Sequence, residues 1–155
     1  MNNFDNKMNH SLPNHAFFKE VECFLDNGMD VTIYVQGGSM RPFLENGDKV
    51  LLTPPSCPEK VNKGSIVLAR TSIGIVLHRV VRIQKQRLLL AGDANAYQLE
   101  QTTPEDVMAI VKAAWRGEQT VDICSFRIRT MAWVWFLFRP FRGCLLRVYY
   151  KLKHE

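Results

Sequence analysis

Ser39 follows two glycines in the segment GGSMRP, residues 37–42. A serine hydroxyl becomes a useful nucleophile when a neighbouring base removes its proton. The glycines let the chain turn and leave space for a peptide backbone to approach. Backbone N–H groups at such a turn could stabilise the oxyanion formed when a carbonyl group is attacked. The segment is therefore a candidate nucleophile site, and an ordinary loop serine is the alternative interpretation.

His78 is the candidate base for this serine. It lies in the run VLHRVV, residues 76–81, which is otherwise apolar and β-branched apart from one arginine. Imidazole is the side chain best suited to accept a serine proton near neutral pH. The other histidines are His10, His15 and His154, near the termini, where a rigid site is not expected. A structural histidine in a strand is the alternative.

An acidic side chain could hold the imidazole in the required tautomer. Asp93 lies in the turn GDAN, residues 92–95, and its carboxylate could accept the second ring N–H of His78. The same aspartate could instead form an Asx-type turn. Glu100 follows seven residues later and is a second candidate. The residues alone leave the choice between Asp93 and Glu100 open.

The surrounding sequence predicts one helix followed by many short strands. Residues 14–27 carry Phe17, Val21, Phe24 and Leu25 on one helical face, which we expect to dock on the rest of the protein. Alternation and apolar runs, separated by Gly and Pro, predict strands at 31–35, 49–53, 65–70, 73–83, 86–91, 107–115 and 120–124. This pattern favours a compact β sheet or partial barrel.

The C-terminal segment, residues 125–155, differs from the body. Apolar and aromatic residues recur at helical spacing, and seven Lys or Arg residues lie between 124 and 153 without any Asp or Glu. These seven exceed the net charge of +5, so the remaining chain is slightly acidic. The basic, aromatic, amphipathic tail could lie on the inner face of a membrane or pack on the β body, and nucleic acid is the least favoured partner.

The chain has 155 residues, 46% of them hydrophobic and 23% charged, which is typical of one folded domain. We expect a disordered terminus at 1–13, a β domain with its leading helix at 14–124 and the tail at 125–155. Four widely spaced cysteines form no metal-binding pair, and no metal or nucleotide motif occurs, so no cofactor is expected. No secretory signal or membrane span is evident, which predicts a cytoplasmic protein.

Four short boxes resemble those of a known peptidase group. The run GSMRPFLENGDKV, residues 38–50, resembles the nucleophile box G-x-S-M-x-P-x-L-x-x-G-D-x-V of signal peptidases. KGSIV at 63–67 is similar to the family's next strand, and HRVV at 78–81 resembles the H-R-V box of the endoplasmic-reticulum and archaeal type. GDAN at 92–95 is similar to the G-D-N-N box. Together they suggest the signal peptidase and LexA-type serine peptidase superfamily.

This resemblance implies a mostly antiparallel β fold with a peptide groove, and a peptidase that cleaves a peptide or leader sequence by acyl transfer. It implies Ser39 as nucleophile, His78 as general base and Asp93 as the orienting acid. The family also has a second acidic residue soon after its last box, so Glu100 remains the alternative to Asp93. No membrane anchor or helix-turn-helix domain is evident before Ser39, so the closest resemblance is to short, stand-alone bacterial members.

Two other hypotheses remain. A non-catalytic module of this fold could hold a peptide or a membrane without cutting, and the departure in the acid box favours it. Self-cleavage, as in LexA-type repressors, is less favoured because no Ala-Gly or Cys-Gly pair precedes Ser39.

Overall fold

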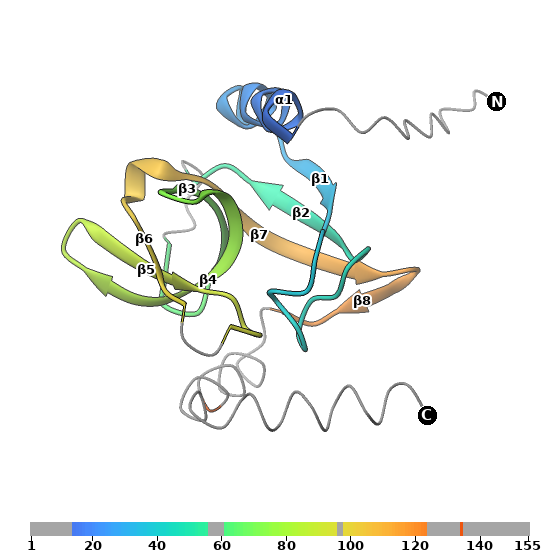
Figure 1. Ribbon diagram of the computed structural model, residues 1–155. Coiled ribbons are helices and arrows are strands. Elements are labelled where there is room, and N and C mark those ends of the chain that lie inside the picture. Colours follow the sequence, from blue (N-terminus) through green and yellow to red (C-terminus); the bar gives the residue numbers. More distant parts are fainter. Residues whose placement is uncertain (1–13, 56–60, 96–97, 124–133, 135–155) are drawn as a thin grey trace.

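The computed structural model describes residues 14–55, 61–95, 98–123 and 134 (Figure 1). The predicted disordered terminus at 1–13 lies outside the described residues. The predicted helical tail at 125–155 also lies outside them, apart from residue 134. No helix within the described ranges has the length and apolar character needed to cross a membrane.

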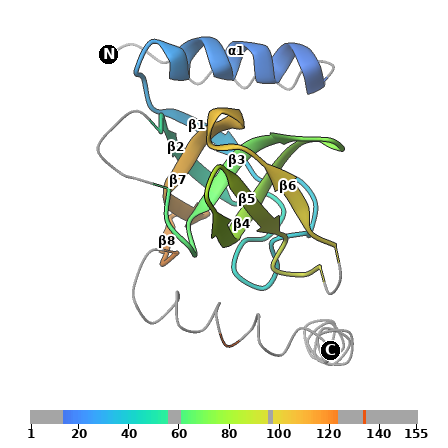
Figure 2. The same ribbon diagram turned by 90° about the vertical axis from the view of Figure 1, so that its left-hand side faces the viewer.

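Helix α1 (Asn14–Asp26) lies across one end of the curled sheet, as Figure 2 shows. Val21 and Leu25 are buried in the core, and Phe18 packs against them. Phe17 and Phe24 remain 37% and 44% exposed, although the sequence pattern placed them on the buried face. The buried stripe follows the spacing i, i+3 and i+7 from Phe18, so the helix is rotated relative to the prediction.

The strands form one antiparallel sheet, with the order β1-β2-β7-β3-β4-β5-β6 and with β8 paired to β7. Their bounds are β1 Val31–Tyr34, β2 Lys49–Thr53, β3 Ile66–Thr71, β4 Gly74–Gln84, β5 Arg87–Ala91, β6 Glu100–Thr102, β7 Val107–Arg116 and β8 Gln119–Val121, with a short 3-10 helix η1 at Pro104–Asp106. The predicted mainly β architecture is confirmed. The sequence analysis missed β6, and β8 is shorter than the expected strand.

The sheet curls so that its last strand returns to the third. The hydroxyl of Thr102 in β6 donates a hydrogen bond of 2.6 Å to the Arg70 carbonyl oxygen in β3. Register shifts interrupt the ladders of β2, β3 and β4, and such bulges bend and twist strands. Figure 1 shows that β3, β4, β5 and β6 are arranged in a ring. The result is a partial barrel.

Two apolar clusters fill this structure. One lies between α1 and the sheet and includes Leu52, Leu68 and Val111. The other includes Val67, Val80 and Leu90, from β3, β4 and β5. Because both faces of the curled sheet are covered, polar side chains on either face of β4 are also buried.

An ion pair between Arg70 and Glu22 connects β3 to α1. The hydrogen bond to Glu22 raises the pKa of the Arg70 guanidinium, so that group stays charged in the folded protein. Both side chains are partly exposed, and such pairs contribute little to stability. The pair helps to align the helix on the sheet.

Candidate active site

Ser39 lies in the nucleophile loop, which we define as residues 36–47 between β1 and β2. Two backbone hydrogen bonds of 2.8 Å between Val35 and the residues Gly47 and Asp48 close the base of this loop. The side chain of Asn46 accepts a further bond of 2.9 Å from the Gly37 N–H. Gly37 and Gly47 have φ of 81° and 88°, a conformation that other residues rarely adopt. These contacts fold the loop back on itself.

Buried side chains hold the loop to the protein body. Met40 and Leu44 are 1% and 0% exposed and belong to the core cluster beneath α1. Asp48 is 2% exposed and accepts two hydrogen bonds, of 2.9 and 2.8 Å, from the guanidinium of Arg116 at the end of β7. Ser39, which precedes Met40 directly, is thereby held half-buried at the edge of the core.

His78 lies in the middle of β4 and is 5% exposed. Its Nδ1 atom lies 2.9 Å from Oε2 of Glu100, which is also 5% exposed. A carboxylate at Nδ1 favours the tautomer with the proton on that nitrogen, which leaves Nε2 as the basic atom. It also stabilises the imidazolium formed when Nε2 takes up a proton.

The strand register explains how Glu100 reaches His78. Val80 in β4 lies opposite Leu90 in β5, and Leu90 lies opposite Glu100 in β6. Side chains paired in this way lie on one face of the sheet, and His78 shares that face because it is two residues from Val80. The curl of the barrel then brings the carboxylate to the imidazole.

Gly92 lies where the Ser39 backbone and the His78 ring approach each other. A Cβ atom built on Gly92 would lie 2.6 Å from the Ser39 carbonyl oxygen and 3.0 Å from His78 Nε2. The Ala94 N–H also donates a hydrogen bond of 2.8 Å to that carbonyl oxygen. The Ser39 backbone and His78 Nε2 are therefore neighbours on either side of the missing Gly92 side chain.

Ser39 and His78 are adjacent without being hydrogen-bonded to each other. Within the part of the chain that the structure describes, neither the Ser39 hydroxyl nor His78 Nε2 takes part in a hydrogen bond. Catalytic hydrogen bonds are often long in enzymes without substrate and shorten in the complex. The site thus places a hydroxyl, an imidazole and a carboxylate in sequence, and the imidazole is hydrogen-bonded to the carboxylate but not to the hydroxyl.

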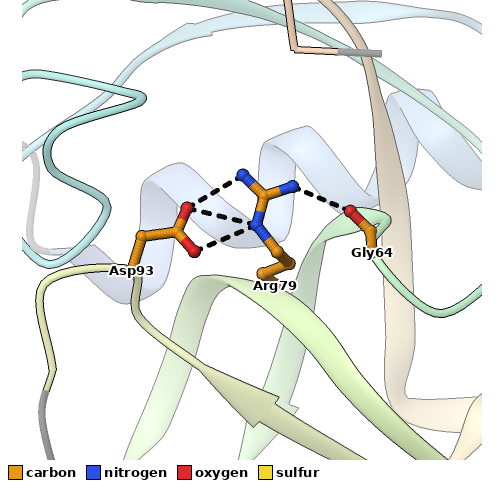
Figure 3. Close-up of polar contacts among 3 residues, drawn as sticks. All are labelled: Gly64, Arg79 and Asp93. Carbon is orange, nitrogen blue, oxygen red and sulfur yellow. Dashed lines mark hydrogen bonds and ion pairs between the residues drawn. The ribbon is translucent and has the colours of Figure 1, made fainter. Parts of the chain in front are cut away.

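Asp93 does not orient His78, contrary to the expectation from the sequence. Its carboxylate accepts hydrogen bonds of 2.9 Å from both Nε and an Nη atom of Arg79, while another Nη atom of Arg79 donates to the Gly64 carbonyl oxygen at 2.8 Å, as Figure 3 shows. Arg79 follows His78 in β4, so its side chain points to the opposite face of the strand. Asp93 binds Arg79 on that opposite face, and Glu100 occupies the position beside His78.

Arg79 is a structural residue that the sequence analysis missed. Its side chain is 4% exposed, and its guanidinium lies 5.2 Å from the centre of the Phe43 ring, within cation–π range. The guanidinium therefore joins the nucleophile loop through Phe43, the segment before β3 through Gly64 and the turn 92–95 through Asp93. The sequence pattern that could have indicated this role is an arginine in an otherwise apolar strand, followed by an aspartate in a turn.

The space at Gly92 leads to a testable prediction. In the Gly92→Ala variant Ser39 should react with a fluorophosphonate probe about tenfold to a hundredfold more slowly, because the new methyl group must push the turn away from Ser39 and His78. The backbone of Gly92 is in a conformation that alanine tolerates, so a slower labelling rate would be due to the space that the added methyl group occupies. The rate of labelling by a fluorophosphonate probe measures it, with Ala94→Gly as a matched control that keeps the N–H donor. Labelling within twofold of the unmodified protein would contradict this geometry.

No group of three His, Cys, Asp or Glu side chains among the described residues is arranged to hold a metal ion. The functional groups of the site are a serine hydroxyl, an imidazole and a carboxylate. Such a set performs nucleophilic acyl transfer.

Comparison with known proteins identifies a family for this chain. A family model described as Peptidase S24-like matches residues 6–115 of the chain. No curated protein and no solved structure matches it. The matched range includes Ser39, His78, Asp93 and Glu100.

Proposed function

Because the chain belongs to the Peptidase S24-like family, within the LexA and signal-peptidase superfamily, we propose that it is a serine peptidase that cleaves a peptide or leader sequence. Ser39 is the nucleophile, His78 the general base and Glu100 the acid that orients His78. Asp93 supports the site through Arg79 and does not act on the imidazole.

The reaction begins when the Ser39 oxygen attacks the scissile carbonyl carbon and its proton passes to His78 Nε2. Glu100 stabilises the resulting imidazolium from Nδ1. The tetrahedral intermediate collapses as His78 donates the proton to the leaving amine, which leaves an acyl ester on Ser39. Water then attacks this ester, with His78 again as base, and releases the second product and the free serine.

One observation carries this proposal: Glu100 binds His78 Nδ1, while His78 Nε2 and the Ser39 backbone both lie within 3.0 Å of the position that a Gly92 Cβ would occupy. A histidine with only a structural role does not require its second nitrogen to face a serine loop. The sheet also ends at β1, next to this loop, and an extended peptide could pair with an edge strand.

Incubation with a peptide library tests the proposal. The purified full-length protein is mixed with a library of diverse peptides, and new ends are identified by mass spectrometry. We expect cleavage products that are absent when Ser39→Ala replaces the unmodified protein. An identical set of products from Ser39→Ala would exclude Ser39 as the nucleophile.

The non-catalytic binding module is the second candidate, and the open contact between the Ser39 hydroxyl and His78 favours it. This alternative predicts that library peptides bind but stay intact, and that Ser39→Ala binds them equally well. Peptide cleavage by the unmodified protein would rule it out.

A further inference from the structure

The hairpin between β4 and β5 carries a cluster of positive charge. Residues 82–87 have the sequence RIQKQR, and all six are exposed. Gln84 and Arg87 form the last pair of the ladder, so Lys85 and Gln86 make the tip of the hairpin. Figure 1 shows this hairpin projecting at the left of the barrel. We call residues 82–87 the basic hairpin.

The three cations of the basic hairpin are not neutralised by any described acidic residue. Arg82, Lys85 and Arg87 form no ion pair within the part of the chain that the structure describes. In one orientation of its amide group, Gln84 accepts hydrogen bonds of 3.2 and 3.1 Å from Nε and an Nη atom of Arg82. This partner is neutral, so the guanidinium keeps its full charge.

Acidic residues are scarce on the strands around the basic hairpin. Neither β4 nor β5 contains an Asp or Glu. The one acidic residue of β6 is Glu100, which binds His78. The next acids along the chain are Glu105 and Asp106 in η1, and Asp106 accepts a hydrogen bond of 2.9 Å from the Thr103 hydroxyl. The three cations exceed these two acids in number.

The strand register gathers the two arginines on one face of the hairpin. Arg82 lies opposite Leu89, and Gln84 lies opposite Arg87. Paired side chains share a face and alternate along each strand, so Arg82 and Arg87 point the same way. Ile83 lies on the other face and is 43% exposed. An exposed aliphatic side chain thus lies beside a cationic face.

The tip residue Lys85 has an unusual backbone conformation. Its φ is 48°, in the left-handed region that Gly, Asn or Asp usually occupies in two-residue hairpin turns. A lysine adopts this conformation less readily than glycine. A less favourable residue at such a position points to a role for its side chain, and here that side chain extends the positive charge to the tip.

We propose that the basic hairpin docks the protein on a membrane surface that contains anionic lipids. Lys and Arg side chains are attracted to the headgroups of such lipids, and an exposed aliphatic side chain beside them enters the boundary with the acyl chains. The basic hairpin has no aromatic side chain on which a nucleic acid base could stack, which favours lipid over single-stranded nucleic acid.

The charge distribution along the chain supports this partner. Residues 124–153 contain seven further Lys or Arg and no Asp or Glu, whereas the rest of the chain is slightly acidic. The protein therefore has two basic regions for an anionic surface, and the basic hairpin belongs to the folded barrel. The proposal does not depend on peptidase chemistry.

Sedimentation with lipid vesicles tests the proposal. The full-length protein is mixed with vesicles of phosphatidylcholine alone or with about one-third phosphatidylglycerol, and the bound fraction gives the partition coefficient. We expect binding to the anionic vesicles that weakens as salt is added, because exposed charges are screened. Each cation near such a surface contributes about fivefold, so Gln at positions 82, 85 and 87 together should weaken binding by about tenfold to a hundredfold.

A control with the same net charge shows whether position matters. Gln at Lys19, Lys49 and Lys112 also removes three exposed cations, from α1, β2 and β7, and should change partitioning by less than about threefold. Lys at positions 82 and 87 keeps the charge and should restore binding. Ile83→Ser should weaken binding by a factor that persists at high salt. Circular dichroism confirms that each variant is folded.

Three results would overturn the proposal. The first is an unmodified protein that does not bind anionic vesicles. The second is an equal loss of binding in the hairpin and control variants, which would show that only net charge matters. The third comes from fluorescence anisotropy with single-stranded and duplex oligonucleotides: if the hairpin variant loses affinity for these but keeps its vesicle binding, the partner is a nucleic acid.

Discussion

In the His78→Ala variant Ser39 should react with a fluorophosphonate probe about a hundredfold to ten-thousandfold more slowly than in the unmodified protein, because the serine hydroxyl then has no positioned base. The buried position of His78 beside Glu100 and Gly92 is the reason for expecting so large an effect. The rate of covalent labelling by a fluorophosphonate probe, followed by intact-mass spectrometry, measures this loss without knowledge of the natural substrate.

A matched control shows whether the loss belongs to this histidine. His154→Ala removes an imidazole near the C-terminus of the sequence and should label at the rate of the unmodified protein. Circular dichroism and the thermal midpoint confirm that both variants are folded. A folded His78→Ala protein that labels at the normal rate would show that another group takes the proton.

Glu100 and Asp93, the two acids near the site, should respond differently to loss of their charge. Glu100→Gln should slow the reaction of Ser39 with the fluorophosphonate probe by about a hundredfold or more while the protein stays folded, because the imidazolium loses its stabilising carboxylate. The second oxygen of Glu100 is buried and has no hydrogen-bond partner among the described residues, so an amide of the same shape breaks no other contact there. The labelling rate is measured from reactions that are quenched at successive times and at increasing probe concentration.

Asp93→Asn should act mainly on stability. It leaves the Arg79 guanidinium buried without its carboxylate, and the loss of one partner from a buried ion pair costs about 3 to 5 kcal/mol. The free energy of unfolding in urea measures this cost. Should Asp93→Asn abolish labelling in a protein of unchanged stability, while Glu100→Gln has no effect, the two roles would be the reverse of those assigned here.

The sequence predicted much of the barrel because hydrophobic alternation reports burial directly. The strand expected at 49–53 agrees with β2 at both ends, and the strands expected at 65–70 and 73–83 agree with β3 and β4 to within one residue at each end. By contrast, β6 consists of three polar residues at the edge of the sheet, where no hydrophobic alternation could reveal it. Its strand character depends on pairing with β5, which is a long-range contact.

The choice between Asp93 and Glu100 required that same pairing. Ser39 and His78 were chosen because the four boxes together resemble those of a peptidase group, although each residue alone also had an ordinary structural interpretation. Which acid meets the imidazole depends on the face of β4 that each acid approaches, and a one-residue difference places His78 and Arg79 on opposite faces. In the structure the turn that carries Asp93 lies on the Arg79 side, so the Asp93 carboxylate binds Arg79, and Glu100 contacts the imidazole of His78. The prediction that Phe17 and Phe24 are buried was wrong for a similar reason. Two apolar stripes of α1 overlap in the sequence, and the sequence does not show which of them packs on the sheet.

The most direct test of the account is the site of covalent modification by a serine-directed phosphonylating reagent. The full-length protein is treated with a fluorophosphonate, digested and mapped by tandem mass spectrometry. We predict one adduct on the peptide that contains Ser39, and no adduct on that peptide in Ser39→Ala. Absence of any adduct, or equal modification of several surface serines such as Ser72, would contradict the claim that this fold activates Ser39.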